Sequence, residues 1–169
     1  MFNNFINVTD IYNMENLVSI PFLIFLPLVI SILILSPLFK NNEIYIRRFV
    51  KSVCCFHFLY SIFVYLMFNP EEPYYSNINI LGLDWIQSLG VKFSFCIDKI
   101  SLILVILTSF IFMIASIVSK LHIRKNHKLY YSMLLLLFSA TLGIFSANDM
   151  LLFFLFWELE LIPAYFLIG

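Results

Sequence analysis

Five separate stretches, each about twenty residues long and almost wholly apolar, are the strongest constraint on how this 169-residue chain folds. A helix needs about 20 mostly apolar residues to cross the hydrocarbon layer of a membrane. The chain is 62% hydrophobic and only 12% charged, whereas a soluble domain is usually about half apolar and a quarter charged. The sequence therefore predicts an all-α fold, a polytopic transmembrane bundle of about five helices. The predicted helices cover residues 17–39, 50–68, 100–119, 129–147 and 150–168.

Local sequence signals predict where the first helix bends and ends, and where the long connection 69–99 forms a turn and a strand. Pro27 should kink the first helix, and Pro37 should help to end it, because proline has no backbone N–H to donate. The connection opens with the turn-rich "NPEEP". Further along, "VKFSFCI" (residues 91–97) alternates apolar with other residues, which predicts a half-buried strand.

The basic residues predict the orientation of the chain in the membrane. Eight of the ten basic residues lie in the two short connections or next to them: Lys40, Arg47, Arg48, Lys51, Lys120, Arg124, Lys125 and Lys128. Short loops rich in Lys and Arg stay on the cytoplasmic side or its organellar equivalent. The N-terminus and the connection 69–99 are then outside, and five crossings leave the C-terminus inside.

Two carboxylic acids, Glu158 and Glu160, lie within the last apolar stretch, "LLFFLFWELELIPAYFLIG". Glu158 should lie roughly 12 Å along that helix, close to the middle of a hydrocarbon layer about 30 Å thick. An acid at that depth costs about 2.5–3.5 kcal/mol, so insertion of this helix alone is close to break-even. Residues two apart differ by about 200° around a helix, so the two carboxylates should face nearly opposite ways.

Two interpretations of these acids are open. In the functional one a carboxylate, Glu158 first and Glu160 second, carries protons, because desolvation raises its pKa toward neutrality. In the structural one both acids are protonated and hydrogen-bonded to neighbouring helices. Pro163 also leaves the carbonyl of Leu159 without its usual helical partner, next to both acids.

Other polar residues are weaker candidates. His57, within the second helix, is more simply a packed neutral histidine than a proton relay, and Asp149 is most simply the N-terminal cap of the last helix. His122 and His127 flank a basic segment and are expected to be solvated. Cys54, Cys55 and Cys96 lack the spacing of a metal or iron–sulfur site and are expected to be packing thiols. A net charge of zero gives no basic surface for nucleic acid.

The segment "NDMLLFFLFWELELIPAYFLIG" resembles the fifth helix of the antiporter-like subunits of respiratory complex I, in particular the chain M or chain 4 branch. In that family a Trp-Glu pair followed by Leu-Ile-Pro marks the proton-channel helix, and its glutamate matches Glu158. The doubled "WELELIP" is similar to the chain 4 branch of cyanobacteria and plastids. Upstream, "LGLDWIQSLGVKFSFCIDKISLILVILTSF" resembles the segment entering the third helix, although Lys99 stands where the family usually has glycine.

The resemblance implies a proton-translocating membrane subunit of a complex I-type NAD(P)H- or ferredoxin-quinone oxidoreductase. Its partners would be the other membrane-arm subunits and the bilayer, and quinone, flavin and iron–sulfur clusters would be bound by partner subunits, not by this chain. The membrane would be a bacterial inner membrane, or a thylakoid or mitochondrial inner membrane. The alternatives are a subunit of a multi-subunit Na+/H+ antiporter or of a hydrogenase-linked membrane arm, and a structural module that transports nothing.

The resemblance also bears on the extent of the chain. Members of the family have about fourteen helices, two of which are interrupted and carry the lysines that partner the glutamate. Residues 1–169 are therefore expected to be the N-terminal part of one larger antiporter-like membrane domain, with those lysines lying outside this sequence.

Overall fold

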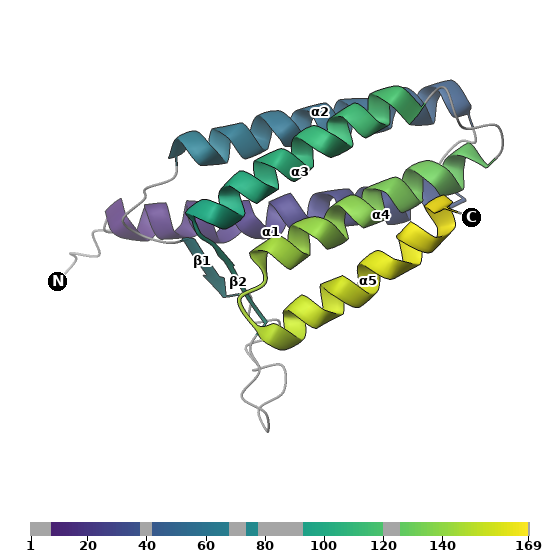
Figure 1. The fold of residues 1–169 in the computed structure, drawn as a ribbon. Helices are drawn as coiled ribbons and strands as arrows, with labels where there is room; N and C mark the ends of the chain where they lie inside the picture. The colour runs from purple at the N-terminus through teal and green to yellow at the C-terminus, as the bar shows by residue number, and fades with distance from the viewer. Residues whose placement is uncertain (1–7, 38–41, 68–73, 78–92, 120–125, 169) are drawn as a thin grey trace.

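The computed structural model describes residues 8–37, 42–67, 74–77, 93–119 and 126–168, in which five helices and two short strands are found (Figure 1). The helices are α1 (Val8–Leu35), α2 (Glu43–Met67), α3 (Lys99–Val118), α4 (His127–Ser146) and α5 (Met150–Ile168). The strands are β1 (Tyr74–Asn77) and β2 (Ser94–Ile97). The predicted all-α membrane bundle is confirmed.

Four helices, α2 to α5, are long and apolar enough to cross a membrane. In α1 the apolar part found among the residues with described side chains, Ile20–Leu35, is shorter. The whole of α1 has 28 residues, which at 1.5 Å per residue extend over about 42 Å. Its length is therefore sufficient for a fifth crossing, which stays a prediction.

Helix α2 begins at Glu43, seven residues before the predicted start at residue 50. The side-chain oxygen of Asn42 accepts hydrogen bonds from the N–H groups of Ile44 at 3.1 Å and Tyr45 at 3.4 Å, and so caps the helix. Hydropathy marks only the apolar part of a helix, whereas the backbone ladder continues through polar residues until a cap ends it. Two basic residues that precede the predicted start, Arg47 and Arg48, are therefore helical.

Helix α1 also begins earlier than predicted, at Val8, and ends earlier, at Leu35. Pro37 follows two residues after this end, and the residue before a proline is disfavoured in the helical conformation. The prediction that Pro37 helps to end the helix is confirmed. Pro27 lies inside α1, which runs on through it; the kink expected there stays a prediction.

Contacts between helix ends show that successive helices alternate in direction. At one end of the bundle the ammonium of Lys128 donates to the carbonyl of Ser36 at 2.6 Å, which joins the start of α4 to the end of α1. At the opposite end the N–H of Asn148, just after α4, donates to the carbonyl of Ser94 in β2 at 3.2 Å. The end of α1 therefore lies beside the start of α4, and the strands lie at the opposite end, beside the turn from α4 to α5 (Figure 1).

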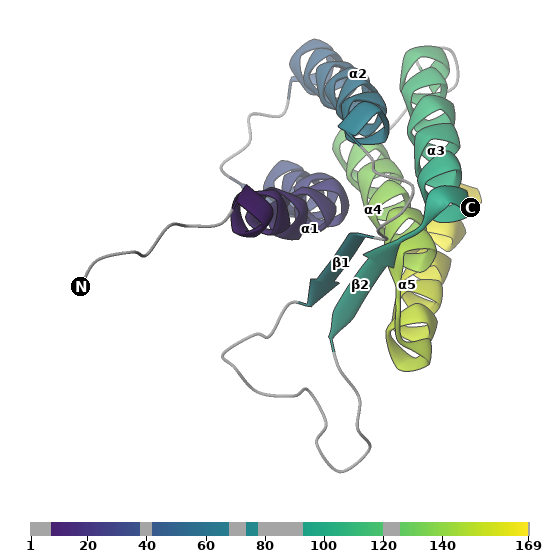
Figure 2. The ribbon, with the colours of Figure 1, turned by 90° about the vertical axis from the view of Figure 1, so that its left-hand side faces the viewer.

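Helix α4 lies at the centre, between α1, α2 and α3 in the end-on view (Figure 2). Of its apolar window 61% is buried, against 17% in α5. Small hydroxyl residues allow α1 and α4 to pack closely: Ser31 and Ser132 donate to each other's carbonyls at 2.8 and 3.0 Å. Ser139 donates to the carbonyl of Ile24 at 2.7 Å. Interfaces between membrane helices are typically built in this way.

The two strands form an antiparallel pair in which Tyr75 lies opposite Cys96. The predicted strand is confirmed at Ser94–Ile97, while residues 91–92 of the prediction lie outside the described residues. The expected alternation is only partly found, because Ser94 is buried along with Phe95 and Ile97. The sequence did not predict β1, since its four residues follow turn signals and have too few alternating positions to identify a strand.

Phe95 anchors the sheet to the bundle. Its side chain is fully buried, and its ring lies 6.1 Å from that of Phe25 in α1 and 5.9 Å from that of Phe156 in α5, centroid to centroid. The strand also forms a bridge between Phe95 and Ala147. Consequently β2 holds the starts of α3 and α5 against α1.

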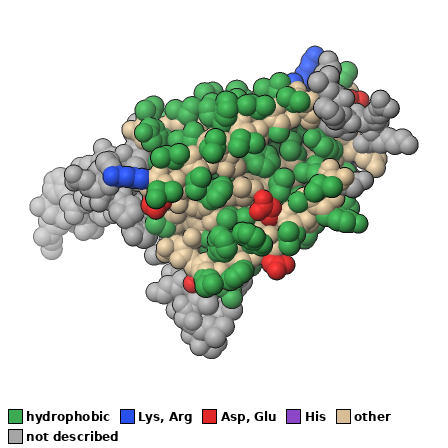
Figure 3. Space-filling view, viewed as in Figure 1, with side chains coloured by type: hydrophobic (Ala, Val, Ile, Leu, Met, Phe, Trp, Pro, Cys, Tyr) green, Lys and Arg blue, Asp and Glu red, His purple; other side chains and the backbone are tan. Residues whose placement is uncertain are grey.

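The face of the bundle shown in Figure 3 is largely apolar. Large hydrophobic side chains cover the face in view, with isolated acidic side chains among them. More than half of the surface of several such residues is exposed, including Ile32, Leu59, Ile103 and Leu161. Such a surface suits lipid or neighbouring membrane helices rather than water.

Candidate functional site

Helix α5 carries both glutamates, and Asp149 fixes where it begins. The carboxylate of Asp149 accepts a hydrogen bond from the N–H of Leu151 at 2.8 Å, and its carbonyl accepts one from the N–H of Phe153 at 2.9 Å. The predicted cap is confirmed, and α5 covers Met150–Ile168 as predicted. Glu158 therefore lies about 12 Å from the start of the helix.

The two carboxylates lie on different sides of α5. Glu158 is exposed, and its neighbours one turn away, Phe154 and Ile162, are 52% and 51% exposed. Glu160 is half-buried. This arrangement agrees with the 200° that separates residues two apart on a helix, so the structure does not bring the two acids together at one site.

Glu160 faces the central helix. One of its carboxylate oxygens lies 3.4 Å from the hydroxyl oxygen of Thr141 on α4. The same hydroxyl donates to the carbonyl of Leu137 at 2.8 Å. The sequence offered no signal for this partner, because Thr141 is nineteen residues away on another helix.

A glycine sets the distance between α4 and α5 near these acids. Gly143 is buried, and a Cβ atom added to it would lie 2.3 to 2.5 Å from ring atoms of Phe156. Real Cβ atoms do not approach other atoms so closely, so only glycine fits here without movement of α5. The close approach holds α5 against α4 along the face opposite to Glu158.

Pro163 lies inside α5 and is buried, and the helix continues beyond it to Ile168. The carbonyl of Leu159 is therefore deprived of its usual intrahelical donor, because proline has no N–H. The prediction that water or a side chain uses this carbonyl stays a prediction.

His57 is fully buried and hydrogen-bonded at both ring nitrogens. Its Nε2 lies 2.7 Å from the carbonyl oxygen of Leu23 on α1, and its Nδ1 lies 3.2 Å from the hydroxyl of Ser109 on α3. Its ring packs edge-on against Phe138 of α4, with centroids 4.6 Å apart. The expected packed histidine is confirmed, but the sequence had indicated no partner for it.

The other predicted candidates lie apart from this site. Nε2 of His127 lies 3.2 Å from a carboxylate oxygen of Glu43, so the side chain is not only solvated but joins the starts of α4 and α2. His122 lies outside the described residues. The three cysteines are free: Cys54 is buried, Cys55 exposed and Cys96 half-buried. Burial, and secondarily the charge of Asp98, raises the pKa of the Cys96 thiol, which makes it less reactive.

Lys99 occupies the position at which the resembling family has glycine. It is the first residue of α3, preceded by the cap Asp98. Among the described non-glycine residues only Asn126 has a positive φ. A lysine therefore fits this turn without strain, and the departure from the family pattern leaves the start of α3 intact.

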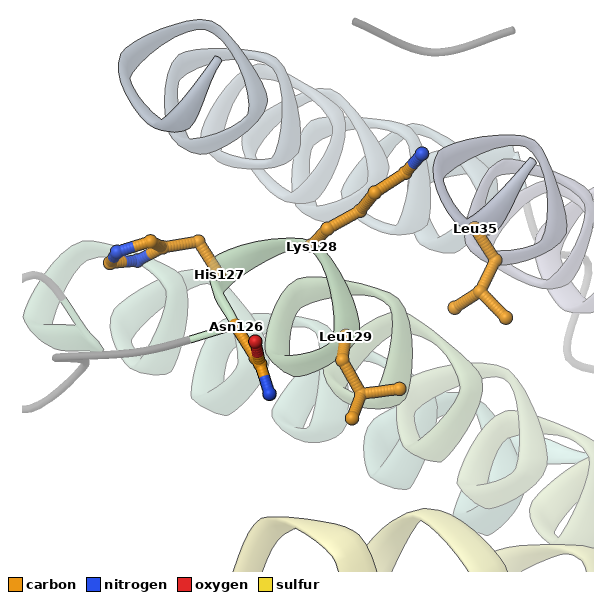
Figure 4. Close-up of a pocket in the computed structure, with 5 residues that line it drawn as sticks. All are labelled: Leu35, Asn126, His127, Lys128 and Leu129. Carbon is orange, nitrogen blue, oxygen red and sulfur yellow. The ribbon is translucent and has the colours of Figure 1, made fainter. Parts of the chain in front are cut away.

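A cavity of about 310 Å³ lies at the end of the bundle where α1 ends and α4 begins (Figure 4). It is lined by Leu35, Asn126, His127, Lys128 and Leu129. The side chains of Lys128 and His127 point in different directions from the first turn of α4. None of the residues that line this cavity belongs to α5, so it is not part of the site in that helix.

Within the part of the chain that the structure describes, no group of three His, Cys, Asp or Glu side chains could hold a metal ion. What the fold and the site define is a multi-pass integral membrane protein with a carboxylic acid on the outer face of a membrane-spanning helix.

Known proteins similar to this chain are named as chains or subunits of NAD(P)H- and NADH-quinone oxidoreductases. No protein-family model matches the chain. The NAD(P)H-quinone oxidoreductase chain 4 2 of Microcystis aeruginosa is 34% identical over 87% of this chain and 26% of its own length. The chloroplastic NAD(P)H-quinone oxidoreductase chain 4 of Chara vulgaris is 32% identical over 83% of this chain and 30% of its own length. The NADH-quinone oxidoreductase subunit M of Buchnera aphidicola (from Schizaphis graminum) is 43% identical over 53% of this chain and 18% of its own length.

The chain is thus homologous to chain 4 and subunit M of the NAD(P)H-quinone oxidoreductases, which confirms the family predicted from the fifth helix. The matches cover less than a third of the length of these relatives.

Proposed function

We propose that this chain is part of the proton-translocating membrane subunit of a complex I-type NAD(P)H-quinone oxidoreductase, and that Glu158 is its proton-carrying carboxylate. The observation that carries the proposal is the position of Glu158: mid-way along a membrane-spanning helix, exposed on the face turned away from α4. An acid in such a position is expected to be functional. The names of the relatives favour a quinone oxidoreductase over an Na+/H+ antiporter or hydrogenase arm.

The exposed face of α5 is the side on which the proton path would lie. A carboxylate facing lipid directly would be costly, so this face needs polar groups or water around it in the assembled protein. The resemblance implies that lysines on later helices of the larger subunit supply them. Redox chemistry would take place in partner subunits that hold the flavin, the iron–sulfur clusters and the quinone.

Glu160 has a different role in this proposal. The Thr141 hydroxyl lies within donating distance of both the carbonyl of Leu137 (2.8 Å) and the carboxylate of Glu160 (3.4 Å). Through this contact Glu160 would join α5 to α4 rather than carry protons.

The orientation is part of the same proposal. The end of the bundle that holds Lys128 and the start of α2, with Arg47 and Arg48, would face the cytoplasm or its organellar equivalent. The N-terminus and the strands would lie on the outer side. The membrane would be a bacterial inner membrane, or the thylakoid or inner mitochondrial membrane of an organelle.

The test is substitution of Glu158 in the assembled complex within its native membrane. Glu158→Gln keeps the volume and hydrogen bonding but removes the exchangeable proton, so proton pumping should fall sharply while the complex assembles. Glu158→Asp should retain part of the pumping, and Glu160→Gln, the matched control, should retain most of it. The measurement is ΔpH formation per quinone reduced, at equal amounts of assembled complex. Wild-type pumping by the Glu158→Gln variant would refute the proton-carrier role.

A further inference from the structure

The backbone of α1 lacks one hydrogen-bond donor, at Pro27, in the middle of the bundle. In an α-helix the carbonyl of each residue accepts a hydrogen bond from the N–H four residues later. Pro27 has no N–H, so the carbonyl of Leu23 has no donor within α1. Leu23 is buried, at 1% exposure, in a part of the membrane where no bulk water is available to replace the missing donor.

His57, from α2, supplies the missing donor to the carbonyl of Leu23. Its Nε2 lies 2.7 Å from the carbonyl oxygen of Leu23, and its side chain is 1% exposed. A carbonyl can only accept a hydrogen bond, so Nε2 carries the hydrogen. The geometry therefore assigns the tautomer of the ring as well as its partner.

The surroundings of the remaining nitrogen fit a neutral ring. Nδ1 lies 3.2 Å from the hydroxyl of Ser109, and in a neutral ring Nδ1 can accept a hydrogen bond from that hydroxyl. The same hydroxyl lies 2.8 Å from the carbonyl of Val105 and can turn to either partner. Among the side chains that the structure describes in α1 (residues 20–35), α3 and α4, which pack around the ring, there is no Asp or Glu to balance an imidazolium; the acids of α1, Asp10 and Glu15, lie two or more turns before Leu23. The nearest titratable side chains along α2 are Cys54 and Tyr60, which are not carboxylic acids.

The ring also touches the central helix, through the edge-on contact with Phe138. Residues of α1, α2, α3 and α4 thus meet at one imidazole. In the end-on view α4 lies between the other three helices (Figure 2). Phe138 lies one turn before Thr141, the residue that contacts Glu160. The contacts of His57 therefore hold in place the helix against which α5 packs.

We propose that His57 is a positioning residue: a neutral, Nε2-protonated side-chain clamp that replaces the backbone donor missing at Pro27 and fixes α1 against α2, α3 and α4. This role does not depend on the proposed proton translocation, and it distinguishes His57 from a proton relay, which would have to change its protonation state.

The clamp makes a specific prediction about a pair of substitutions. His57→Phe removes the donor and keeps an aromatic ring, so it leaves the Leu23 carbonyl unsatisfied and should reduce the folded-to-unfolded ratio about tenfold or more. Pro27→Ala restores an N–H within α1 that can reach this carbonyl. In the Pro27→Ala background, His57→Phe should therefore have a much smaller effect. His57→Gln, whose amide can donate, should lie between wild type and His57→Phe.

The experiment uses the protein in its native membrane, assembled with its partners, and measures its resistance to heat and protease at equal expression. An equal loss on His57→Phe in both backgrounds would overturn the clamp. A second measurement keeps the proposal testable if His57→Phe fails to assemble: nitrogen-15 NMR of the histidine-labelled protein at pH 7, with His57→Gln to assign the signal. The expected signal is that of a neutral ring protonated at Nε2, and a cationic or Nδ1-protonated ring would overturn the proposal.

Discussion

Thr141 on α4 and Glu160 on α5 meet side by side, with 3.4 Å between the hydroxyl and a carboxylate oxygen. Glu158, two residues earlier, lies outside this contact and is exposed. The two acids of one short motif therefore have different surroundings. Glu160 contacts α4, whereas Glu158 lies on the side of α5 that is turned away from α4.

The Thr141–Glu160 contact should be measurable as a coupling energy. Thr141→Val removes the hydroxyl at nearly constant volume and should destabilise the protein by about 1 kcal/mol. Combined with Glu160→Leu, the two losses should be less than additive, because each substitution removes the same contact. Thermal unfolding in lipid nanodiscs measures the effect. The control is Thr108→Val with Glu160→Leu, since Thr108 donates only within α3, to Leu104. Strict additivity for the Thr141 pair would exclude the contact.

Gly143→Ala should loosen α5 from α4. The new methyl group would overlap the ring of Phe156, at 2.3 to 2.5 Å, and overpacking of this kind typically costs about 1–3 kcal/mol. The same thermal measurement should show a smaller loss in a Phe156→Leu background, where the ring is absent. If Gly143→Ala is tolerated equally in both backgrounds, the close approach of the two helices is wrong.

Asp98 should stabilise the start of α3 in a pH-dependent way. Its carboxylate accepts the N–H of Ser101, which is the main reason that its pKa lies below the usual value, with the Ser101 hydroxyl as a second cause. A depressed pKa means that the stabilisation is present above the ordinary value of 3.8 and is lost as the pH falls through the lower, folded-state pKa.

Asp98→Ala should therefore destabilise the protein at pH 7 by about 0.5–2 kcal/mol, the usual range for loss of a helix cap. The difference from wild type should shrink in acid below the ordinary pKa, as followed by circular dichroism of the protein in nanodiscs. Asp149→Ala, which removes the corresponding cap of α5, is the matched comparison. A difference that is constant down to the most acid pH would show that the charge of Asp98 contributes nothing.

Orientation can be tested with single cysteines at opposite ends of the bundle. In a background with Cys54, Cys55 and Cys96 replaced by serine or alanine, Asn126→Cys should react with an impermeant thiol reagent only from the inside. Asn148→Cys, at the other end, should react from the outside. Both positions are exposed. Labelling of the Asn126→Cys variant from outside intact cells would reverse the proposed orientation.

Local signals allowed some elements to be predicted closely. The limits of α5 and its cap at Asp149 were correct, because a cap followed by an apolar run is a complete local signal. The early starts of α1 and α2 were missed because hydropathy reports apolarity and not backbone hydrogen bonding. The ion pair of His127 with Glu43 joins residues more than eighty positions apart, and nothing in either local sequence indicates the other.

The partner of His57 was also missed, although a usable signal was present. A proline in a buried helix identifies, four residues before it, one carbonyl that needs a donor from elsewhere. For Pro27 that residue is Leu23, and a buried histidine on the next helix is a natural donor. The sequence could have indicated the kind of partner, but only the packing of α1 against α2 could identify which residue it is.

The bridge between Phe95 and Ala147 fixes the chain just before α5 begins, and so sets how deep each residue of α5 lies in the bundle. From that fixed point the chain enters the helix within three residues, and every further residue advances it by about 1.5 Å and turns it by about 100°. One residue inserted between Ala147 and Glu158 would move the carboxylate only slightly deeper but would turn it by more than a quarter of a revolution. Chain length therefore affects the direction in which the Glu158 side chain points around the helix axis much more than it affects the depth of that side chain. The small sheet at the end of the bundle sets both.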